Sequence, residues 1–289
     1  MEIPNLNMKD INKIFTRIGL ADAQGNEYYE RQKKCTQLYD YLTVIMAVLR
    51  KLSSKRTLYL LDSACGRSYL SFFLNYVLRE MGRSNLHFIG VDSNAELIDK
   101  CRLTASNLEF YNMEFIDGKI IDCNIQHDID IAYNLHACDT ATDQAILKGI
   151  VTNARYILSV SCCQHFTKRQ MKQHPLTGIT RHARYKERMV DMVSDSLRAL
   201  LLETFGYKVD VFEFTSPKST PKNIILRAEW VNSTDEKRSK ALDKYMELAD
   251  MFNVRPALAS YLLEHGLNNA HHIYSDSFVM LLQHYRGIV

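Results

Sequence analysis

Apolar residues recur along the chain in two alternating patterns, short continuous runs and longer stretches with helical spacing. The short runs predict β-strands over residues 57–62, 87–92, 108–110, 130–135 and 156–161. Helical spacing predicts helices over residues 28–52, 69–81, 95–105 and 143–153. Strands that alternate with helices predict a parallel, doubly wound sheet covered by helices on both faces.

A different pattern follows the fifth predicted strand. Apolar side chains after Met189 lie on one helical stripe, and Gly206 ends this long helix. Residues 208–214 and 223–230 then predict two strands, which are antiparallel because the loop between them is too short for a crossover helix. We therefore expect an α/β fold, a Rossmann-like doubly wound seven-stranded sheet with an antiparallel terminal hairpin.

The order of these elements predicts three parts of the chain. They are an N-terminal helical segment over residues 1–54, a main domain over 55–232 with a basic insertion over 166–188, and a C-terminal helical extension over 233–289. The chain has 289 residues, of which 46% are hydrophobic and 24% charged. That length and composition support a large core and exclude wholesale disorder.

The sequence shows no targeting or membrane signal. Its first residues do not combine a basic segment with an apolar one, and the longest aliphatic stretch, residues 44–49, is far shorter than the about 20 residues of a membrane span. We expect a soluble, cytoplasmic protein without a membrane partner. Its seven cysteines are then expected to be reduced thiols.

Unusual residues stand where the first two strands end. Asp62 closes the first strand and is followed by a turn of small residues with a single glycine, Gly66. Dinucleotide-binding loops have three glycines, so the turn favours a ligand without a pyrophosphate, such as S-adenosylmethionine. Asp92 closes the second strand, where an acid is placed to accept both ribose hydroxyls. Each acid alone is equally well explained as a helix cap.

Four motifs in order resemble one enzyme family. They are DSACGRSYLS at residues 62–71, LHACDTATD at 135–143, SCCQH at 161–165, and the pair RYKER at 184–188 and TPKN at 220–223. The first resembles motif I of class I S-adenosylmethionine-dependent methyltransferases. The others resemble a branch that includes bacterial methyltransferases of poorly defined substrate and the eukaryotic tRNA 2′-O-methyltransferase. The resemblance spans about residues 25–232, without the zinc-finger segments of the tRNA enzymes, and Cys65 replaces a smaller residue of many relatives.

The resemblance implies a methyltransferase domain over residues 55–232 with S-adenosyl-L-methionine as its cofactor. The predicted cofactor-binding residues are Asp62, Ala64, Cys65, Gly66, Tyr69, Asp92, Ser93, Met113, Glu114, Asn134 and His136.

Side chains able to assist methyl transfer gather after the fourth and fifth strands. The predicted catalytic residues are His136, Asp139, His165 and Cys163. Either histidine titrates near neutral pH and suits removal of a proton from the nucleophile, and Asp139 is a candidate to orient an imidazole.

The cysteines allow other roles. Cys162, Cys163, His165 and His136 are four zinc-type ligands. Consecutive cysteines in a strand point to opposite faces, so we predict no metal site unless the strand has already ended. A cysteine nucleophile and simple packing by Cys138 and Cys162 stay open as alternatives.

Positive charge is concentrated directly after these motifs. Residues 168–188 hold seven basic residues against one acid, Glu187, whereas the whole chain carries +3. This predicts a polyanionic substrate, RNA (tRNA or rRNA) rather than DNA, although a solvated surface loop explains the charge too. The predicted substrate-binding residues are Arg169, Arg181, Arg184, Tyr185, Lys186 and Lys222. Residues 28–34 are a candidate second wall with tyrosines for base stacking.

Two other functions stay open at this point. One is a methyltransferase for a small molecule or a protein, in which the basic loop binds a phosphate or carboxylate. The other is a non-catalytic module that binds the cofactor or RNA.

Overall fold

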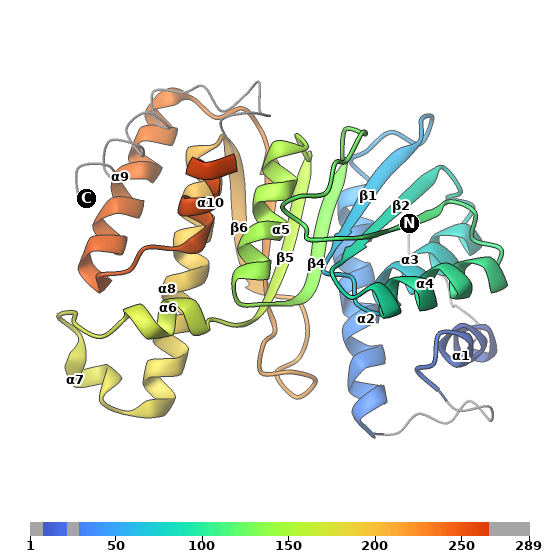
Figure 1. Ribbon diagram of the computed structural model, residues 1–289, viewed down its shortest axis with the longest axis horizontal. Coiled ribbons are helices and arrows are strands. Elements are labelled where there is room, and N and C mark those ends of the chain that lie inside the picture. Colours follow the sequence, from blue (N-terminus) through green and yellow to red (C-terminus); the bar gives the residue numbers. More distant parts are fainter. Residues whose placement is uncertain (1–7, 22–28, 266–289) are drawn as a thin grey trace.

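A computed structural model describes residues 8–21 and 29–265, which contain a seven-stranded sheet in the order β3-β2-β1-β4-β5-β7-β6 (Figure 1). The strands are β1 (Leu58–Ser63), β2 (Leu86–Asp92), β3 (Met113–Asp117), β4 (Ile131–Cys138), β5 (Tyr156–Cys163), β6 (Tyr207–Glu213) and β7 (Ile224–Trp230). Strands β1 to β5 pair in parallel, and β7 is antiparallel to both β5 and β6. The predicted doubly wound sheet with a terminal hairpin is confirmed.

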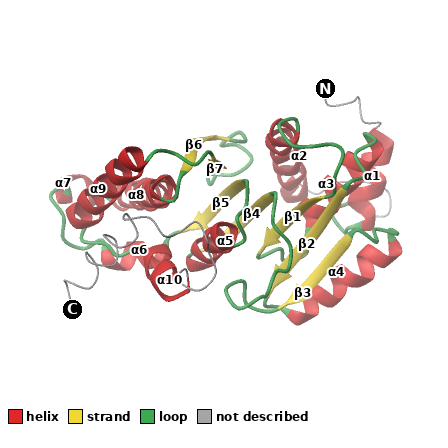
Figure 2. Ribbon diagram, turned by 90° about the horizontal axis from the view of Figure 1, so that it is seen from above, coloured by secondary structure: helices red, strands yellow, loops and turns green. Residues whose placement is uncertain are grey.

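Helices cover both faces of the sheet (Figure 2). They are α1 (Met8–Arg17), α2 (Tyr29–Leu49), α3 (Tyr69–Glu80), α4 (Ala95–Asn107), α5 (Thr140–Val151), α6 (His165–Gln170), α7 (Thr177–Thr180), α8 (Ala183–Thr204), α9 (Asp235–Phe252) and α10 (Ala257–His265). Buried side chains of α1 to α4 form one hydrophobic cluster, and those of α5, α8, α9 and α10 form another. Leu60 belongs to the first cluster and Leu61 to the second, because successive strand residues point to opposite faces.

The third predicted strand was wrong. Residues 108–110 form the turn that ends α4, where the Leu108 amide donates to the Thr104 carbonyl at 3.0 Å and Glu109 has a φ of 55°. Leu108 and Phe110 are apolar because they are buried at this helix end. The strand itself begins three residues later, at Met113.

The C-terminal helices pack on the sheet domain. Leu242 and Tyr245 of α9 and Leu258 and Leu262 of α10 are fully buried in the cluster that also contains α5 and α8. The division at residues 54 and 232 stays a prediction. Within residues 8–21 and 29–265, no helix is long and apolar enough to cross a membrane.

A buried charge network joins α5, α8 and the end of β5. The Arg198 guanidinium donates to both carboxylate oxygens of Asp143, at 2.8 and 3.0 Å, and also to Asp195 at 3.1 Å. It donates further to the Gln164 side-chain carbonyl at 2.8 Å, and the Gln164 amide donates to Ser161 at 2.8 Å. The segment after β5 is therefore held by an ion pair whose two side chains are almost fully buried, with exposed fractions of 4% and 6%.

Replacement of Arg198 by methionine is expected to lower the free energy of unfolding by about 3–5 kcal/mol, because Asp143 loses the partner of its buried charge. Lys240→Met is the matched control, since Lys240 pairs with Glu236 on an exposed helix face and such pairs contribute at most about 1 kcal/mol. Urea unfolding measures both variants. Equal losses would show that the buried network does not stabilise the fold.

Candidate functional site

The turn after β1 curves its backbone around an open space. Ala64, Gly66 and Ser68 have φ values of 58°, 55° and 50°, and a Cβ added at Gly66 would meet nothing within 4 Å. The Gly66 amide donates to Asp92 Oδ2 at 2.8 Å, and the Cys65 amide donates to the Val91 carbonyl at 3.0 Å. The turn is thereby fixed to the end of β2, with room in front for a ligand.

Asp62 lies buried beneath this turn and forms no ion pair within the described residues. Its carboxylate accepts hydrogen bonds from Ser68 and Ser71, and the Ser71 hydroxyl also contacts the Tyr133 hydroxyl at 2.7 Å. Burial raises the pKa of Asp62 to about 7. A bound group with an ammonium or a sulfonium charge would stabilise the ionised carboxylate, and S-adenosylmethionine carries both, so the site fits that cofactor.

Asp92 stands at the carboxyl edge of the sheet, as predicted. Its Oδ1 accepts a hydrogen bond from the Asn94 amide at 3.0 Å, while its Oδ2 accepts that of Gly66. An ionised carboxylate has about four acceptor sites, so Asp92 keeps capacity for ribose hydroxyls. Ser93, which follows it, is exposed. Their role in cofactor binding stays a prediction.

Met113 and Glu114 do not join this group, which corrects part of the predicted cofactor site. They begin β3 and pair with Phe88 and Ile89, whereas Asp117 is the residue that pairs with Asp92. The error follows from the wrong third strand, which placed them after a strand instead of at its start.

Tyr69, Cys65 and Asn134 are also near the strand ends, with different surroundings. The ring of Tyr69 lies 4.5 Å from the Lys34 ammonium, and its hydroxyl accepts from Arg67 at 3.0 Å. A hydrogen bond with Cys101 and burial raise the pKa of the Cys65 thiol. The Asn134 amide donates to the Val160 carbonyl at 3.0 Å inside the sheet, so its side chain is already used to join β4 to β5.

His136 sits at a break in the regular pairing of β4. Its φ is 62°, and the register with β5 shifts between Leu135 and Ala137. The Gln37 amide donates to the Ser219 carbonyl at 3.1 Å, so the Gln37 carbonyl oxygen faces His136 Nε2 at 2.8 Å. This arrangement puts the imidazole proton on Nε2.

The second nitrogen of this imidazole is free to accept a proton. Nδ1 of His136 is buried and has no hydrogen-bond partner among the described residues. Partial burial, together with the positive charge of Lys34, lowers the pKa of His136 below 6.5. His136 is therefore a neutral imidazole at pH 7, and its role as a general base stays a prediction because Nδ1 is enclosed by the described residues.

Asp139 does not orient an imidazole in the described structure. Its Oδ1 accepts the Phe166 amide at 2.8 Å, and its Oδ2 lies 3.9 Å from the Arg169 guanidinium. The predicted pairing with His136 or His165 is corrected accordingly. Asp139 instead positions the segment that follows β5.

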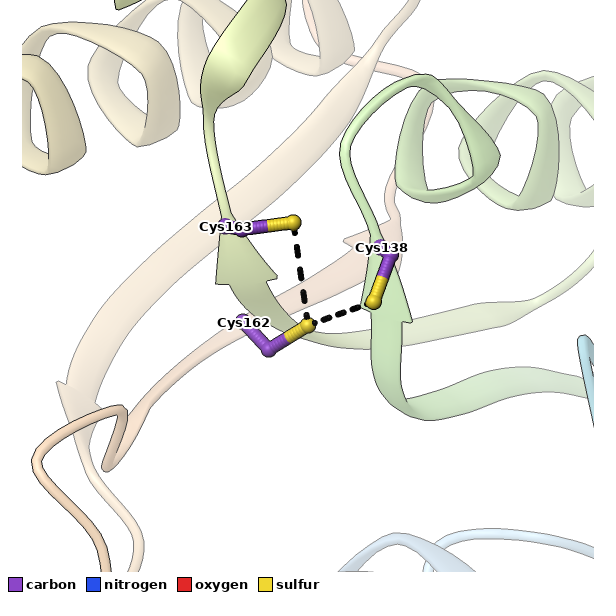
Figure 3. Close-up of side chains that lie close together, drawn as sticks. All are labelled: Cys138, Cys162 and Cys163. Carbon is purple, nitrogen blue, oxygen red and sulfur yellow. Dashed lines mark hydrogen bonds between the residues drawn. The ribbon is translucent and has the colours of Figure 1, made fainter.

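Three cysteine sulfurs meet where β4 and β5 end (Figure 3). Cys162 Sγ lies 3.0 Å from Cys138 Sγ and 4.0 Å from Cys163 Sγ. The expectation that adjacent cysteines diverge was wrong here, because the strand pairing is irregular at this end and the backbone turns into α6. The imidazole of His136 points to Gln37 instead of this cluster, and His165 is not part of it.

A cavity of about 680 Å³ opens beside the cysteines. It is lined by Cys162, Cys163, Gln164, His165, Lys168, Arg184, Glu187, Arg188, Val190, Asp191, Glu213, Pro217, Pro221, Lys222 and Asn223. Of the predicted catalytic and substrate residues, it brings together Cys163, His165, Arg184 and Lys222.

The other predicted substrate residues lie outside the cavity lining. Arg181 and Tyr185 are exposed around the start of α8, with Tyr185 54% exposed, and Lys186 is half-buried. Of the second candidate wall, Tyr28 and the side chains of Tyr29 and Arg31 fall outside the described residues.

Sequence reasoning missed three parts of this site. Gln37 contacts His136, which is 99 positions away, and Ser219 lies in the β6–β7 loop. No local sequence pattern predicts either contact. Arg198 is one of four basic residues of α8, and no local pattern marks it as the buried one. Cys138 stood in a recognised motif, but its closeness to Cys162 depends on strand register.

The chain is similar to methyltransferases by sequence model and by structure. Residues 33–170 match the family model of a methyltransferase domain. An S-adenosylmethionine-dependent methyltransferase from Aquifex aeolicus is 16% identical, with 78% of this chain and 100% of that chain covered and a TM-score of 0.38. Magnesium protoporphyrin IX methyltransferase from Synechocystis PCC 6803 is 13% identical, with coverage of 78% and 100% and a TM-score of 0.46. A Podospora anserina methyltransferase is 11% identical, with coverage of 75% and 87% and a TM-score of 0.48. No curated protein matches the chain.

The contribution of Asp62 to the free energy of unfolding is expected to fall as pH rises from about 4 to 7. Below the unfolded-state pKa of 3.8 both states hold the proton; above it the unfolded chain releases the proton, while the folded state retains it up to about pH 7. The loss reaches about 4 kcal/mol at most. Urea unfolding of the parent and of Asp62→Asn across this range checks it, and parallel pH profiles would contradict it.

Proposed function

We propose that this chain, an S-adenosylmethionine-dependent methyltransferase, acts on RNA, with tRNA or rRNA as its substrate class. The observation that carries the proposal is the position of the basic segment. The cavity beside Cys163 and His165 is lined by four bases, Lys168, Arg184, Arg188 and Lys222, together with three acids, Glu187, Asp191 and Glu213. The excess of positive charge belongs to residues 168–188, which hold seven basic residues against one acid in a chain that carries only +3 overall. This segment forms α6, α7 and the start of α8, which follow β5 (Figure 1).

Several of these basic side chains have no acidic partner among the described residues and are therefore available to bind phosphates. Lys168 lies 3.6 Å from Glu187, and Lys222 pairs with Asp191. Within the described part of the chain, Arg184, Lys186 and Arg188 form no ion pair with an acid. The exposed Tyr185 ring stands among them and offers a stacking surface for a base.

The chemistry follows from the two histidines. S-adenosylmethionine supplies a methyl group on a sulfonium, which is already activated, so the protein has to position the nucleophile and accept its proton. His165 lies on the cavity wall, whereas His136, a neutral acceptor through its enclosed Nδ1, is not among the residues that line the cavity. A ribose hydroxyl needs such a base, whereas a ring nitrogen of a base does not.

A small-molecule substrate is the second candidate. The cavity of about 680 Å³ falls within the range of about 300–1,000 Å³ that is usual for sites of small ligands. In that case Arg184 and Lys222 bind a phosphate or a carboxylate of the substrate.

The decisive experiment uses cofactor with a labelled methyl group. The purified chain is incubated with total RNA, protein and metabolite fractions from cells that lack it, and label is expected in the RNA fraction. Label confined to metabolites would favour the second candidate, and label confined to protein would overturn both.

Reversal of Arg181, Arg184 and Lys186 to glutamate is expected to weaken RNA binding at least tenfold at low salt. It should also reduce the slope of log affinity against log salt by up to about three, one for each phosphate that is no longer neutralised. Lys237, Lys240 and Lys244 of α9, which line a separate cavity, provide a control with the same charge change. Filter retention across salt concentrations measures RNA binding, and calorimetry should show unchanged cofactor affinity. Equal retention of both variants would remove the main support for RNA.

Replacement of His136 or His165 by alanine is expected to slow single-turnover methyl transfer by about 10²–10⁴-fold, the usual contribution of a placed base. Cofactor binding, measured by calorimetry, should hold. If only cofactor binding falls, the residue contributes to the cofactor-binding site and not to proton removal. Full activity of both variants would point to a ring nitrogen as the methylated atom.

A further inference from the structure

The three cysteine sulfurs at the ends of β4 and β5 form a compact triangle. Their Sγ atoms all lie within 4.8 Å of one another, with the closest pair at 3.0 Å. They come from two neighbouring strands, and in Figure 3 all three thiols point toward a common centre. No other group of three or more such ligand atoms occurs in the described part of the chain.

The triangle matches the size of a tetrahedral metal site. A zinc ion bound to sulfur at about 2.3 Å, at tetrahedral angles, needs sulfurs about 3.8 Å apart. The separations of Cys162 Sγ from the other two sulfurs, 3.0 and 4.0 Å, lie on either side of that value. Shifts of less than about an ångström, within reach of χ1 rotations at a strand end, would give the required geometry.

A disulfide explains the triangle less well. A bond between Cys138 and Cys162 needs their sulfurs at about 2.05 Å, and it would leave Cys163 without a role. The residue directly paired with Cys138 across the sheet is Cys163, whereas its nearest sulfur is that of Cys162. Cys138 thus has one neighbour by sulfur distance, Cys162, and another by strand pairing, Cys163, and all three sulfurs lie within 4.8 Å.

We infer that Cys138, Cys162 and Cys163 form a binding site for a thiophilic divalent cation of the zinc class, with a fourth ligand position open to the cavity. Binding releases three protons, one from each thiol, and the complex of one divalent cation with three thiolates carries a net charge of −1. Water takes the fourth position and completes the coordination. Cys162 and Cys163 themselves line the cavity, so this position is accessible from it.

The open position lies in the cavity that the proposed function assigns to the substrate. Catalytic zinc sites keep such a position, and an ion there lowers the pKa of a donor atom that binds it. Metal binding itself does not depend on the identity of the substrate, so it is tested without RNA or cofactor.

The test begins with protein that has been reduced and freed of metal with a chelator. Titration with Zn²⁺ is expected to show one ion bound per chain, with proton release that is measurable by a pH indicator. Titration with Co²⁺ should give the sulfur-to-cobalt charge-transfer band and the ligand-field bands of a tetrahedral ion. Both measurements use the unaltered chain and do not depend on the folding of a variant.

Cysteine-to-serine variants then assign the ligands. Cys138→Ser, Cys162→Ser and Cys163→Ser are each expected to weaken Zn²⁺ binding at least 100-fold and to reduce the charge-transfer band. Cys123→Ser is the matched control, because Cys123 is a half-buried free thiol outside the cluster. Retained cofactor affinity shows that each variant is folded.

Three results would overturn the site. The first is the absence of stoichiometric Zn²⁺ and of the cobalt bands in the reduced, unaltered chain. The second is equal metal affinity in the cluster variants and in Cys123→Ser. The third is rapid formation of a Cys138–Cys162 disulfide, detected by mass as the loss of two hydrogens, in protein that binds no metal. Failure of RNA methylation with metal binding intact would refute the proposed function alone.

Discussion

The buried ion pair between Arg198 and Asp143 is the interaction on which the site most depends. The guanidinium compensates the charge of Asp143 at the start of α5 and reaches Gln164 after β5. A buried charge without a partner is so unfavourable that these groups have to meet in one geometry. The ends of β4 and β5, which carry the cysteines and both histidines, are thereby held in a fixed relation. Two motif residues, Asp143 and Gln164, are thus used for positioning and not for chemistry.

Backbone strain is concentrated at the same strand ends. His136 and Asp139 both have positive φ, which costs a residue other than glycine on the order of 1–3 kcal/mol. Each side chain forms a hydrogen bond with another element: His136 with the Gln37 side chain, and Asp139 with the Phe166 amide. Such strain persists only where surrounding contacts determine the conformation, and here it turns Cys138 toward the sulfur of Cys162.

How far the sequence predicts this molecule depends on whether a feature is local. Apolar periodicity predicted the sheet and its hairpin, because the periodicity of a strand or helix depends only on the residues of that element. The third strand failed because residues 108–110 are apolar for a different reason, burial at the end of α4. At the site, Asp62 and Asp92 were identifiable from their position after strands. The partner of His136 was not, because Gln37 reaches it from a helix 99 positions away.

The helix α8 connects the basic segment to the carboxyl ends of β4 and β5. Arg184 and Arg188 stand at its start on the cavity wall, and Arg198 lies within the same helix in the buried network. At about 1.5 Å per residue, the roughly 10 residues from Arg188 to Arg198 span about 15 Å along a continuous helix. In the proposed function, a polyanion contacts the first turns of α8, and Arg198 of the same helix is anchored to the end of β5. The proposed substrate-binding residues and the three cysteines are therefore attached to one rigid unit.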